Sequence, residues 1–344
     1  MQLYEITIRP QSGLGTPLKG DTLFGHFCWQ AAYDPSLLKG GLDNLLADYS
    51  QNPAVIFSSA FPKVERDGVV YYALKRPALP AAYFPLSLGE DKVQVLKARK
   101  EQKQKRWLLV AADLHLDFSP ARLASDQDLL TWLVSPTARR LPHSWPQRLQ
   151  TAAYTTELAQ PHNTINRLSG TTGEGMFAPY TQEIMYYYPG AELAIFVLLE
   201  ESVTDIQRLR LALERIGQWG FGKDASIGQG RFQVVSTQKL AWPQNNQANA
   251  AYTLAPCVPP AQGFIGSCSL PFVRFGKHGD IYARSGQPFK NPVLMAAAGA
   301  VFWPQDRSFF NKPYLGTAVT GISKTCPTAV MQGYAPYLPC NVEI

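Results

Sequence analysis

Hydrophobic and polar residues alternate along the first segment of the chain, residues 3–10 (LYEITIRP), which predicts a β-strand. After a loop rich in Gly and Pro, residues 21–33 (DTLFGHFCWQAAY) repeat hydrophobic positions with helical spacing, and Asp21 is expected to cap this helix. One side of the helix is predicted to enter the core. The other side suits either base and phosphate contacts or packing against an inserted segment or another subunit. Its residues are Thr22, His26, Trp29, Gln30 and Tyr33.

A second helix is predicted for residues 206–219, where hydrophobic residues recur on one face. Thr204 and Gln207 are expected to form a capping box at its start. Two strands, residues 184–189 and 191–200, precede this helix and are expected to pair through a tight Pro-Gly turn.

With a last strand at residues 231–240, the order is strand, helix, strand, strand, helix, strand, which is typical of a ferredoxin-like unit. We therefore predict an α+β fold with such a unit at residues 1–240, interrupted by a large insertion at about 50–182. Residues 241–262 are rich in Asn, Gln, Ala and Pro and are expected to be a linker. Residues 263–344 contain short β-like runs and predict a second, β-rich domain.

Composition narrows the class of protein. The chain has 344 residues, of which 46% are hydrophobic, enough for two domains with a sizeable core. A net charge of +6 favours polyanionic partners. Five cysteines without a CxxC pair argue against a disulfide framework and a zinc site, so no metal or other cofactor is expected. Because no signal peptide or bilayer-spanning run is visible, we expect a cytoplasmic protein without a membrane partner.

A glycine-rich loop follows the second helix. Its glycines are Gly217, Gly220, Gly222, Gly228 and Gly230. Glycines allow the backbone to approach a ligand, and successive N–H groups can form an anion-binding concavity. Lys223 and Arg231 flank them and suit a phosphate backbone. The GxxxxGK spacing does not predict a P-loop, because Asp224 replaces the required Ser or Thr and the helix precedes the loop. A tight turn with spare glycines is the alternative.

The predicted insertion contains two segments of interest. Residues 92–106 (KVQVLKARKEQKQKR) predict a basic helix that is either a docking site for RNA or an acidic partner, or a solvated surface. Residues 162–177 (HNTINRLSGTTGEGMF) form a polar, glycine-rich loop without core periodicity, which is typical of a functional loop. Its side chains of the types that contact phosphates and base edges are His162, Asn163, Asn166, Arg167, Thr171 and Thr172.

Three segments together, TPLKGDTLFGHFCW, HNTINRLSGTTGEGMF and GFGKDASIGQGRF, resemble the RAMP superfamily. Within it, the chain is similar to the type III-A (Csm-type) CRISPR effector subunit that holds the 5′ tag of the CRISPR RNA (crRNA). The C-terminal GISKTCPTAVMQGYAPYLP is also similar to that subunit. The resemblance spans nearly the whole chain. It implies two ferredoxin-like (RRM-like) units, the second degenerate.

The resemblance also implies the contacts of a non-catalytic subunit. The first helix and the glycine loop would clamp the tag through Lys19, Gly20, Asp21, Thr22, His26, Gly220, Gly222, Lys223, Gly228, Gly230 and Arg231. The polar loop would lie in a thumb near the first base pairs of guide and target RNA, with contacts from His162, Asn163, Arg167, Thr171 and Thr172. The large polymerase-like subunit and the backbone subunit would be the protein partners.

Some alternatives stay open at this point. A metal-independent repeat endoribonuclease would use His26 or His162 as a general acid or base, although neither has an evident partner in the sequence. A scaffold would contact protein alone. Asp224 is unfavourable beside phosphate and is expected to pair with Arg231 or Lys223.

Overall fold

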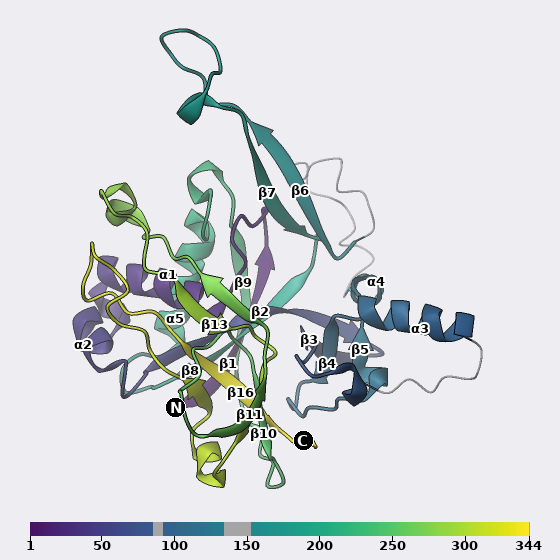
Figure 1. The fold of residues 1–344 in the computed structure, drawn as a ribbon. Coiled ribbons are helices and arrows are strands. Elements are labelled where there is room, and N and C mark those ends of the chain that lie inside the picture. The colour runs from purple at the N-terminus through teal and green to yellow at the C-terminus, as the bar shows by residue number, and fades with distance from the viewer. Residues whose placement is uncertain (85–91, 134–152, 344) are drawn as a thin grey trace.

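The structure is a computed structural model that describes residues 1–84, 92–133 and 153–343. It has an α+β fold, as predicted, built mainly from antiparallel sheets with few helices (Figure 1). In the part of the chain that the structure describes, no helix combines the length and the apolar character needed to span a bilayer.

A seven-stranded sheet organises the first two thirds of the chain. Its strands, in sheet order, are β5 (Leu123–Ala124), β4 (Trp107–Ala111), β3 (Val69–Lys75), β2 (Val55–Arg66), β8 (Glu192–Leu199), β1 (Gln2–Pro10) and β9 (Phe232–Leu240). Two helices pack side by side against it, α1 (Gly20–Tyr33) on β2 and α5 (Ile206–Trp219) on β9. A short helix, α2 (Gly41–Asp48), follows α1. The helix predicted at 206–219 is confirmed, because its apolar stripe is buried against the sheet.

The predicted hairpin of residues 184–189 and 191–200 is wrong in its pairing. The turn exists, with Ala191 N–H donating to Tyr188 C=O at 2.9 Å. However, β7 (Tyr180–Tyr187) pairs with β6 (Thr155–His162), whereas β8 lies between β1 and β2. The turn reverses the chain but leaves the two strands in different sheets. The strand beside β8 is instead β2, which lies inside the range predicted for the insertion.

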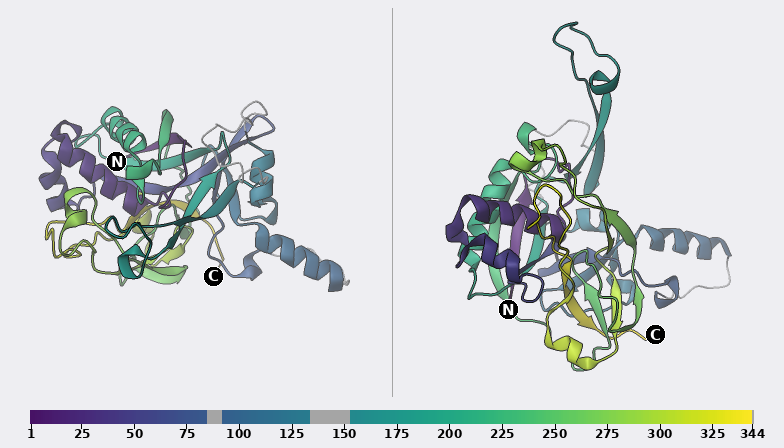
Figure 2. Two further views of the ribbon diagram at one scale, coloured as in Figure 1. Left: turned by 90° about the horizontal axis from the view of Figure 1, so that it is seen from above. Right: turned by 60° about the vertical axis from the view of Figure 1, so that its left-hand side comes forward.

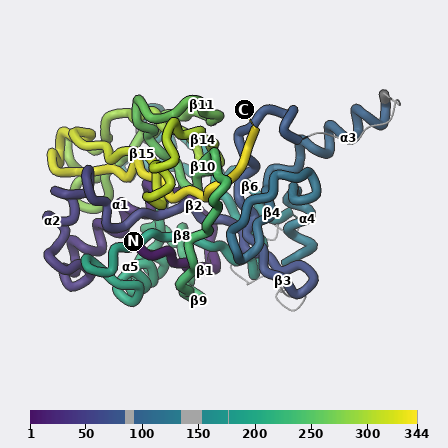
Figure 3. The backbone as a smooth tube through the Cα atoms, turned by 90° about the horizontal axis from the view of Figure 1, so that it is seen from below, coloured from purple at the N-terminus to yellow at the C-terminus, as the bar shows by residue number. Residues whose placement is uncertain are grey.

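The segment between β2 and β8 extends the fold in two directions. The strands β3, β4 and β5 lengthen the large sheet, together with the short helix α4 (Asp126–Thr131). The helix α3 (Lys92–Gln104) points away from the body beside them (Figure 3). The hairpin β6–β7 projects from another side and carries the polar loop at its tip (Figure 2, right).

The last third of the chain is β-rich, as predicted. Its five-stranded sheet has the order β11 (Phe264–Cys268), β14 (Val301–Pro304), β10 (Ala250–Thr253), β16 (Tyr334–Cys340) and β15 (Tyr314–Gly316). Two further strands, β12 (Pro271–Arg274) and β13 (Val293–Ala296), form a separate ribbon. The segment 241–262 is not an open linker, because it supplies β10, which is buried between two neighbouring strands.

One hydrophobic core joins both parts of the chain. It includes Phe57 on β2 together with Tyr334 and Leu338 on β16. The side-chain amide of buried Gln332 accepts a hydrogen bond from Phe57 N–H at 2.9 Å and donates one to Phe57 C=O at 2.8 Å. The Gln332 side chain thus makes the two hydrogen bonds that the backbone of a neighbouring strand would make to Phe57. Phe57 lies at the start of a β-bulge in β2. The two parts of the chain therefore share one continuous hydrophobic core.

Both predicted helix caps are wrong in detail. The backbone of Lys19 precedes α1 without a side-chain cap, since Asp21 lies within the first turn and points elsewhere. At the start of α5 the cap is Asp205, whose carboxylate accepts from the N–H groups of Gln207 and Arg208. Thr204 is buried and donates its hydroxyl to Leu37 C=O at 2.7 Å. Both predicted capping side chains, Asp21 and Thr204, thus bind groups that lie far away in the sequence instead of capping their helices.

Candidate nucleic-acid interface

The glycine loop between α5 and β9 folds tightly onto itself. Phe221 N–H donates to Gly230 C=O at 2.9 Å, and Gly230 N–H donates to Gly13 C=O at 2.7 Å. Gly230 has a φ of 76°, and a Cβ atom there would overlap the Phe221 carbonyl oxygen. Gly228 also has a positive φ, of 91°, but a Cβ there would meet no neighbour. The loop therefore needs Gly230 for its own packing, and Gly228 is open to an approaching ligand.

His26 on α1 holds this loop in place. Its Nε2 atom accepts a hydrogen bond from Gly222 N–H at 3.1 Å, and its ring packs against Phe221 with centroids 4.5 Å apart. Burial lowers the pKa of His26 to about 4, so the imidazole is neutral near pH 7 and can act as an acceptor. The structure thus brings together two segments that lie nearly 200 residues apart in sequence.

Most N–H groups of the loop are already used inside the protein, contrary to the expected N–H concavity. Lys223 N–H donates to Thr16 Oγ1 and Arg231 N–H donates to Ser12 Oγ, both at 2.9 Å. Further N–H donors bonded to protein oxygens are those of Gly220, Phe221, Ile227, Gly228, Gln229 and Gly230. The side chains of Lys223 and Arg231 are exposed. The loop can therefore meet a phosphate through these two cations rather than through a nest of amides.

The expected pairing of Asp224 with Lys223 or Arg231 is wrong. The Asp224 carboxylate accepts a hydrogen bond from the side-chain amide of Gln182 on β7. Nearby, Leu14 N–H donates to Met185 C=O at 2.8 Å. The strand β7 of the hairpin is thus tied to the glycine loop and to the loop after β1. Asp224 is therefore turned toward β7 and forms no ion pair with Lys223 or Arg231.

The N-terminal end of α1 is packed against the C-terminal part of the chain. The Asp21 carboxylate forms an ion pair with Arg274 on β12 at 2.6 Å, and their side chains are only 2% and 17% exposed. Gly20 is buried, and a Cβ there would overlap the Phe57 carbonyl oxygen. Thr22 donates its hydroxyl to Lys19 C=O at 2.8 Å. Asp21 therefore holds two parts of the fold together.

Positive charge is concentrated around Lys19. Its ammonium lies 4.3 Å from the centre of the Phe272 ring. Burial, and next the charges of Arg274 and Lys75, lower the pKa of Lys19, whereas Asp21 opposes this shift. Lys19 thus lies among other cations, an arrangement that a bound anion would stabilise. Sequence reasoning missed Arg274, Lys75 and Phe272, because no local pattern links them to the first helix.

The polar loop lies at the far end of the β6–β7 hairpin (Figures 1 and 2). His162 ends β6 and stacks on Tyr180 with centroids 5.4 Å apart. Asn166 organises the tip, since its N–H donates to Thr171 C=O at 3.0 Å and its C=O accepts from Gly170 N–H at 2.8 Å. The side chains left exposed at the tip are those of Asn163, Arg167, Thr171 and Thr172. The predicted site residues therefore lie at three places: the glycine loop with His26, the start of α1, and this tip.

The basic segment 92–106 contains the predicted helix, α3, which contacts the body near its C-terminal end. There the Arg76 guanidinium donates to Gln102 C=O at 2.8 Å. Arg106 forms an ion pair with Asp126. The side chains of Lys97, Arg99, Lys100 and Lys103 are exposed.

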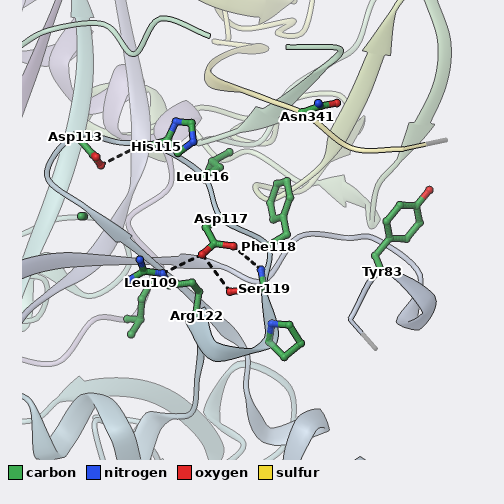
Figure 4. Close-up of a pocket in the computed structure, with 12 residues that line it drawn as sticks. Tyr83, Leu109, Asp113, His115, Leu116, Asp117, Phe118, Ser119, Arg122 and Asn341 are labelled. Carbon is green, nitrogen blue, oxygen red and sulfur yellow. Dashed lines mark hydrogen bonds and ion pairs between the residues drawn. The ribbon is translucent and has the colours of Figure 1, made fainter. Parts of the chain in front are cut away.

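A hollow lined by both polar and apolar side chains lies beside β4 (Figure 4). Asp117 lies in it and pairs with Arg122 at 3.2 Å, while its carboxylate also accepts from Ser119. None of the predicted RNA-contact residues lines this hollow. Among residues 1–84, 92–133 and 153–343, no cluster of His, Cys, Asp and Glu is arranged to hold a metal ion.

Comparison with known proteins gives a fold match without a sequence match. No protein-family model and no curated protein sequence matches the chain. Among solved structures, a chain of a Csm1–Csm4 cassette in complex with pppApA is 14% identical, with a TM-score of 0.53 over 100% of this chain and 99% of that chain. A chain of a Csm3–Csm4 subcomplex of the type III-A CRISPR-Cas interference complex is 11% identical, with a TM-score of 0.58 over 99% of this chain and 100% of that chain.

The chain thus shares the fold of chains found in type III-A CRISPR-Cas complexes, along its whole length. The resemblance inferred from the sequence motifs is confirmed at the level of the fold.

Proposed function

We propose that this chain is a Csm4-like, non-catalytic subunit of a type III CRISPR-Cas ribonucleoprotein that holds the repeat-derived 5′ tag of the crRNA. In the complex it would bridge the large polymerase-like subunit to the backbone subunits. Csm4 is the component named in both of the similar complexes, one with Csm1 and one with Csm3. Such a subunit would work in the cytoplasm.

The observation that carries the proposal is the contact of the glycine loop with the first helix and with a strand of the hairpin that carries the polar loop. The glycine loop is held by His26 of α1 and, through the contact of Asp224 with Gln182, by the strand β7. Exposed Lys223 and Arg231 and the cationic surroundings of Lys19 add positive charge near these segments. A loop held by internal hydrogen bonds, with exposed cations at its ends, suits a polyanionic RNA end, because little of the protein has to be ordered on binding.

We also propose that each part of the chain is a ferredoxin-like unit, the first at residues 1–240 and the second, degenerate, at 263–344. The sheet order β9-β1-β8-β2, with α1 after β1 and α5 after β8, supports this for the first unit. The hairpin β6–β7 would then be the thumb, and its exposed tip would lie near the first base pairs of guide and target RNA.

A repeat endoribonuclease is less well supported. A general base needs a free nitrogen within reach of the attacking 2′-hydroxyl. Nε2 of His26 already accepts the Gly222 N–H. His162 lies against Tyr180, and the structure places no Lys or Tyr hydroxyl in a hydrogen bond with its ring among the described residues. These contacts favour binding over catalysis.

The direct test is to purify the complex through this chain and to sequence the 5′ ends of the RNA that copurifies. A tag binder should yield RNAs that share one repeat-derived 5′ end. Random 5′ ends would contradict tag binding. Incubating the isolated chain with repeat RNA in EDTA tests the nuclease alternative, since specific cutting that His26→Ala abolishes would replace our proposal.

A further inference from the structure

Exposed hydrophobic side chains are concentrated on one small element, the β12–β13 ribbon. On it, Val273 and Leu294 are opposite each other in the register and are 46% and 65% exposed. Phe275 continues the same side of β12 and is 73% exposed, and Phe289, opposite Lys277, is 66% exposed. We call Val273, Phe275, Phe289 and Leu294 the ribbon patch. Scattered exposed hydrophobic residues are ordinary, but a contiguous group of this kind marks an interaction surface.

The other face of the ribbon explains why the patch stays outside. Phe272 and Arg274 alternate with the patch residues along β12 and face the start of α1, where they meet Lys19 and Asp21. Met295 on β13 is fully buried. The ribbon is thus fixed to the body by its inner face. It belongs to neither of the larger sheets, and the side chains on its outer face stay exposed in the described part of the chain.

The composition of the patch favours protein over RNA as its occupant. Single-stranded RNA is bound by aromatic platforms on which bases stack. Half of the ribbon patch is aliphatic, and the exposed side chains at its ends, Leu270 and Ile281, are aliphatic too. Aliphatic groups cannot stack on bases but pack well in the apolar centre of a protein interface.

Charge around the patch specifies the kind of protein. Lys277 and Arg284 are exposed at its edge, and between residues 264 and 294 Asp280 is the sole acidic residue. Asp280 accepts a hydrogen bond from the Tyr33 hydroxyl, so it is turned toward α1. A second copy of this chain would bring cation against cation. A partner with acidic residues around an apolar centre would match both features.

We propose that the outer face of the β12–β13 ribbon docks a different protein subunit, whose contact surface is apolar at the centre and acidic at the rim. This inference rests on the proposed function, in which the chain is one subunit of a larger particle. It adds which surface of the chain makes a protein contact and what chemistry the partner presents there.

The test measures the affinity of the purified chain for the purified large subunit and for the purified backbone subunit of the same complex. The variant V273E/L294E places two carboxylates on the patch. The matched control, V69E/V235E, places two carboxylates at exposed hydrophobic positions on β3 and β9. We expect V273E/L294E to bind one of the two subunits at least about tenfold more weakly, with an unchanged melting temperature, and the control to bind like the wild type.

A second variant, K277E/R284E, tests the acidic rim. It should weaken binding of the same subunit and reduce the salt dependence of that binding. Unchanged affinity of V273E/L294E for both subunits overturns the inference, and so does a loss confined to RNA content or to self-association. If the wild-type chain binds neither subunit, the proposed function fails and the inference falls with it. If the wild type binds both and V273E/L294E does too, the inference alone fails.

Discussion

Nε2 of His26 accepts the Gly222 N–H at 3.1 Å, which makes a neutral imidazole part of the glycine loop. Protonation removes that lone pair, and the buried ring would then carry a charge. The geometry of the loop is therefore linked to the protonation of one residue on α1.

Acidification should destabilise the protein through His26. Its pKa is about 4 in the folded chain and about 6.5 when unperturbed. Between these values the unfolded state binds more protons than the folded state, so the free energy of unfolding falls as the pH drops through this window. The loss for this one group is on the order of 3 kcal/mol.

Urea unfolding of the wild type and of His26→Gln at several pH values checks this. Burial also lowers the pKa of His278, but both proteins contain His278 and it affects their stability in the same way. The difference between the two profiles therefore isolates His26. Parallel profiles would show that His26 does not titrate in this range.

Asp21→Asn should destabilise the fold rather than only weaken RNA binding. It leaves Arg274 buried without its carboxylate, next to Lys19. Removal of one partner from a buried ion pair costs about 3–5 kcal/mol. The double variant D21N/R274M should recover much of this loss in urea unfolding. Additive losses in the two single variants and the double variant would contradict the coupling of the pair.

Two glycines of the loop should respond differently to alanine. Gly230→Ala combines a positive φ with an overlap with the Phe221 carbonyl and should cost about 3 kcal/mol or more of unfolding free energy. Gly228→Ala has the positive φ without the overlap and should cost about 1–2 kcal/mol. Equal losses would show that the loop is not packed as described. RNA binding by the folded Gly228→Ala variant then tests whether this open position approaches the ligand.

Arg231→Ala should weaken RNA retention without unfolding the chain, because the side chain is exposed while the backbone N–H that bonds Ser12 remains. Loss of one phosphate contact lowers the slope of log affinity against log salt by about 1. A binding titration at several salt concentrations measures this. Arg9→Ala, at an exposed arginine that pairs with Glu192, is the control. Normal RNA content and an unchanged salt slope would exclude Arg231 from the interface.

Arg167→Ala should weaken the binding of target RNA rather than the retention of crRNA. The residue is exposed in the loop between β6 and β7, outside the segments that surround the glycine loop. If the tip lies near the first guide–target base pairs, the variant should retain crRNA but bind target RNA about tenfold more weakly, as expected for one or two lost polar contacts. Ser169→Ala, at a neighbouring exposed residue, serves as the control. A loss of crRNA itself would assign Arg167 to tag binding instead.

The local elements and the motifs could be predicted from the amino-acid sequence. The strand at 3–10 and the helices at 21–33 and 206–219 were predictable, because period-2 and period-3.6 patterns are local properties. The glycine loop, the polar loop and the basic helix were also visible in advance. The α+β class follows from the same patterns.

The tertiary structure alone decided how distant segments pair. The choice of β2 rather than β7 as the neighbour of β8 depends on which strand buries more apolar surface beside it, and a turn motif does not encode that choice. Likewise, Asp21 meets Arg274 and Asp224 meets Gln182 only once the chain has folded. The wrong predictions for the helix caps and for the partner of Asp224 have one physical reason. A polar side chain that loses water on folding must bond to whichever group the fold brings next to it, and that group can lie far away in the sequence.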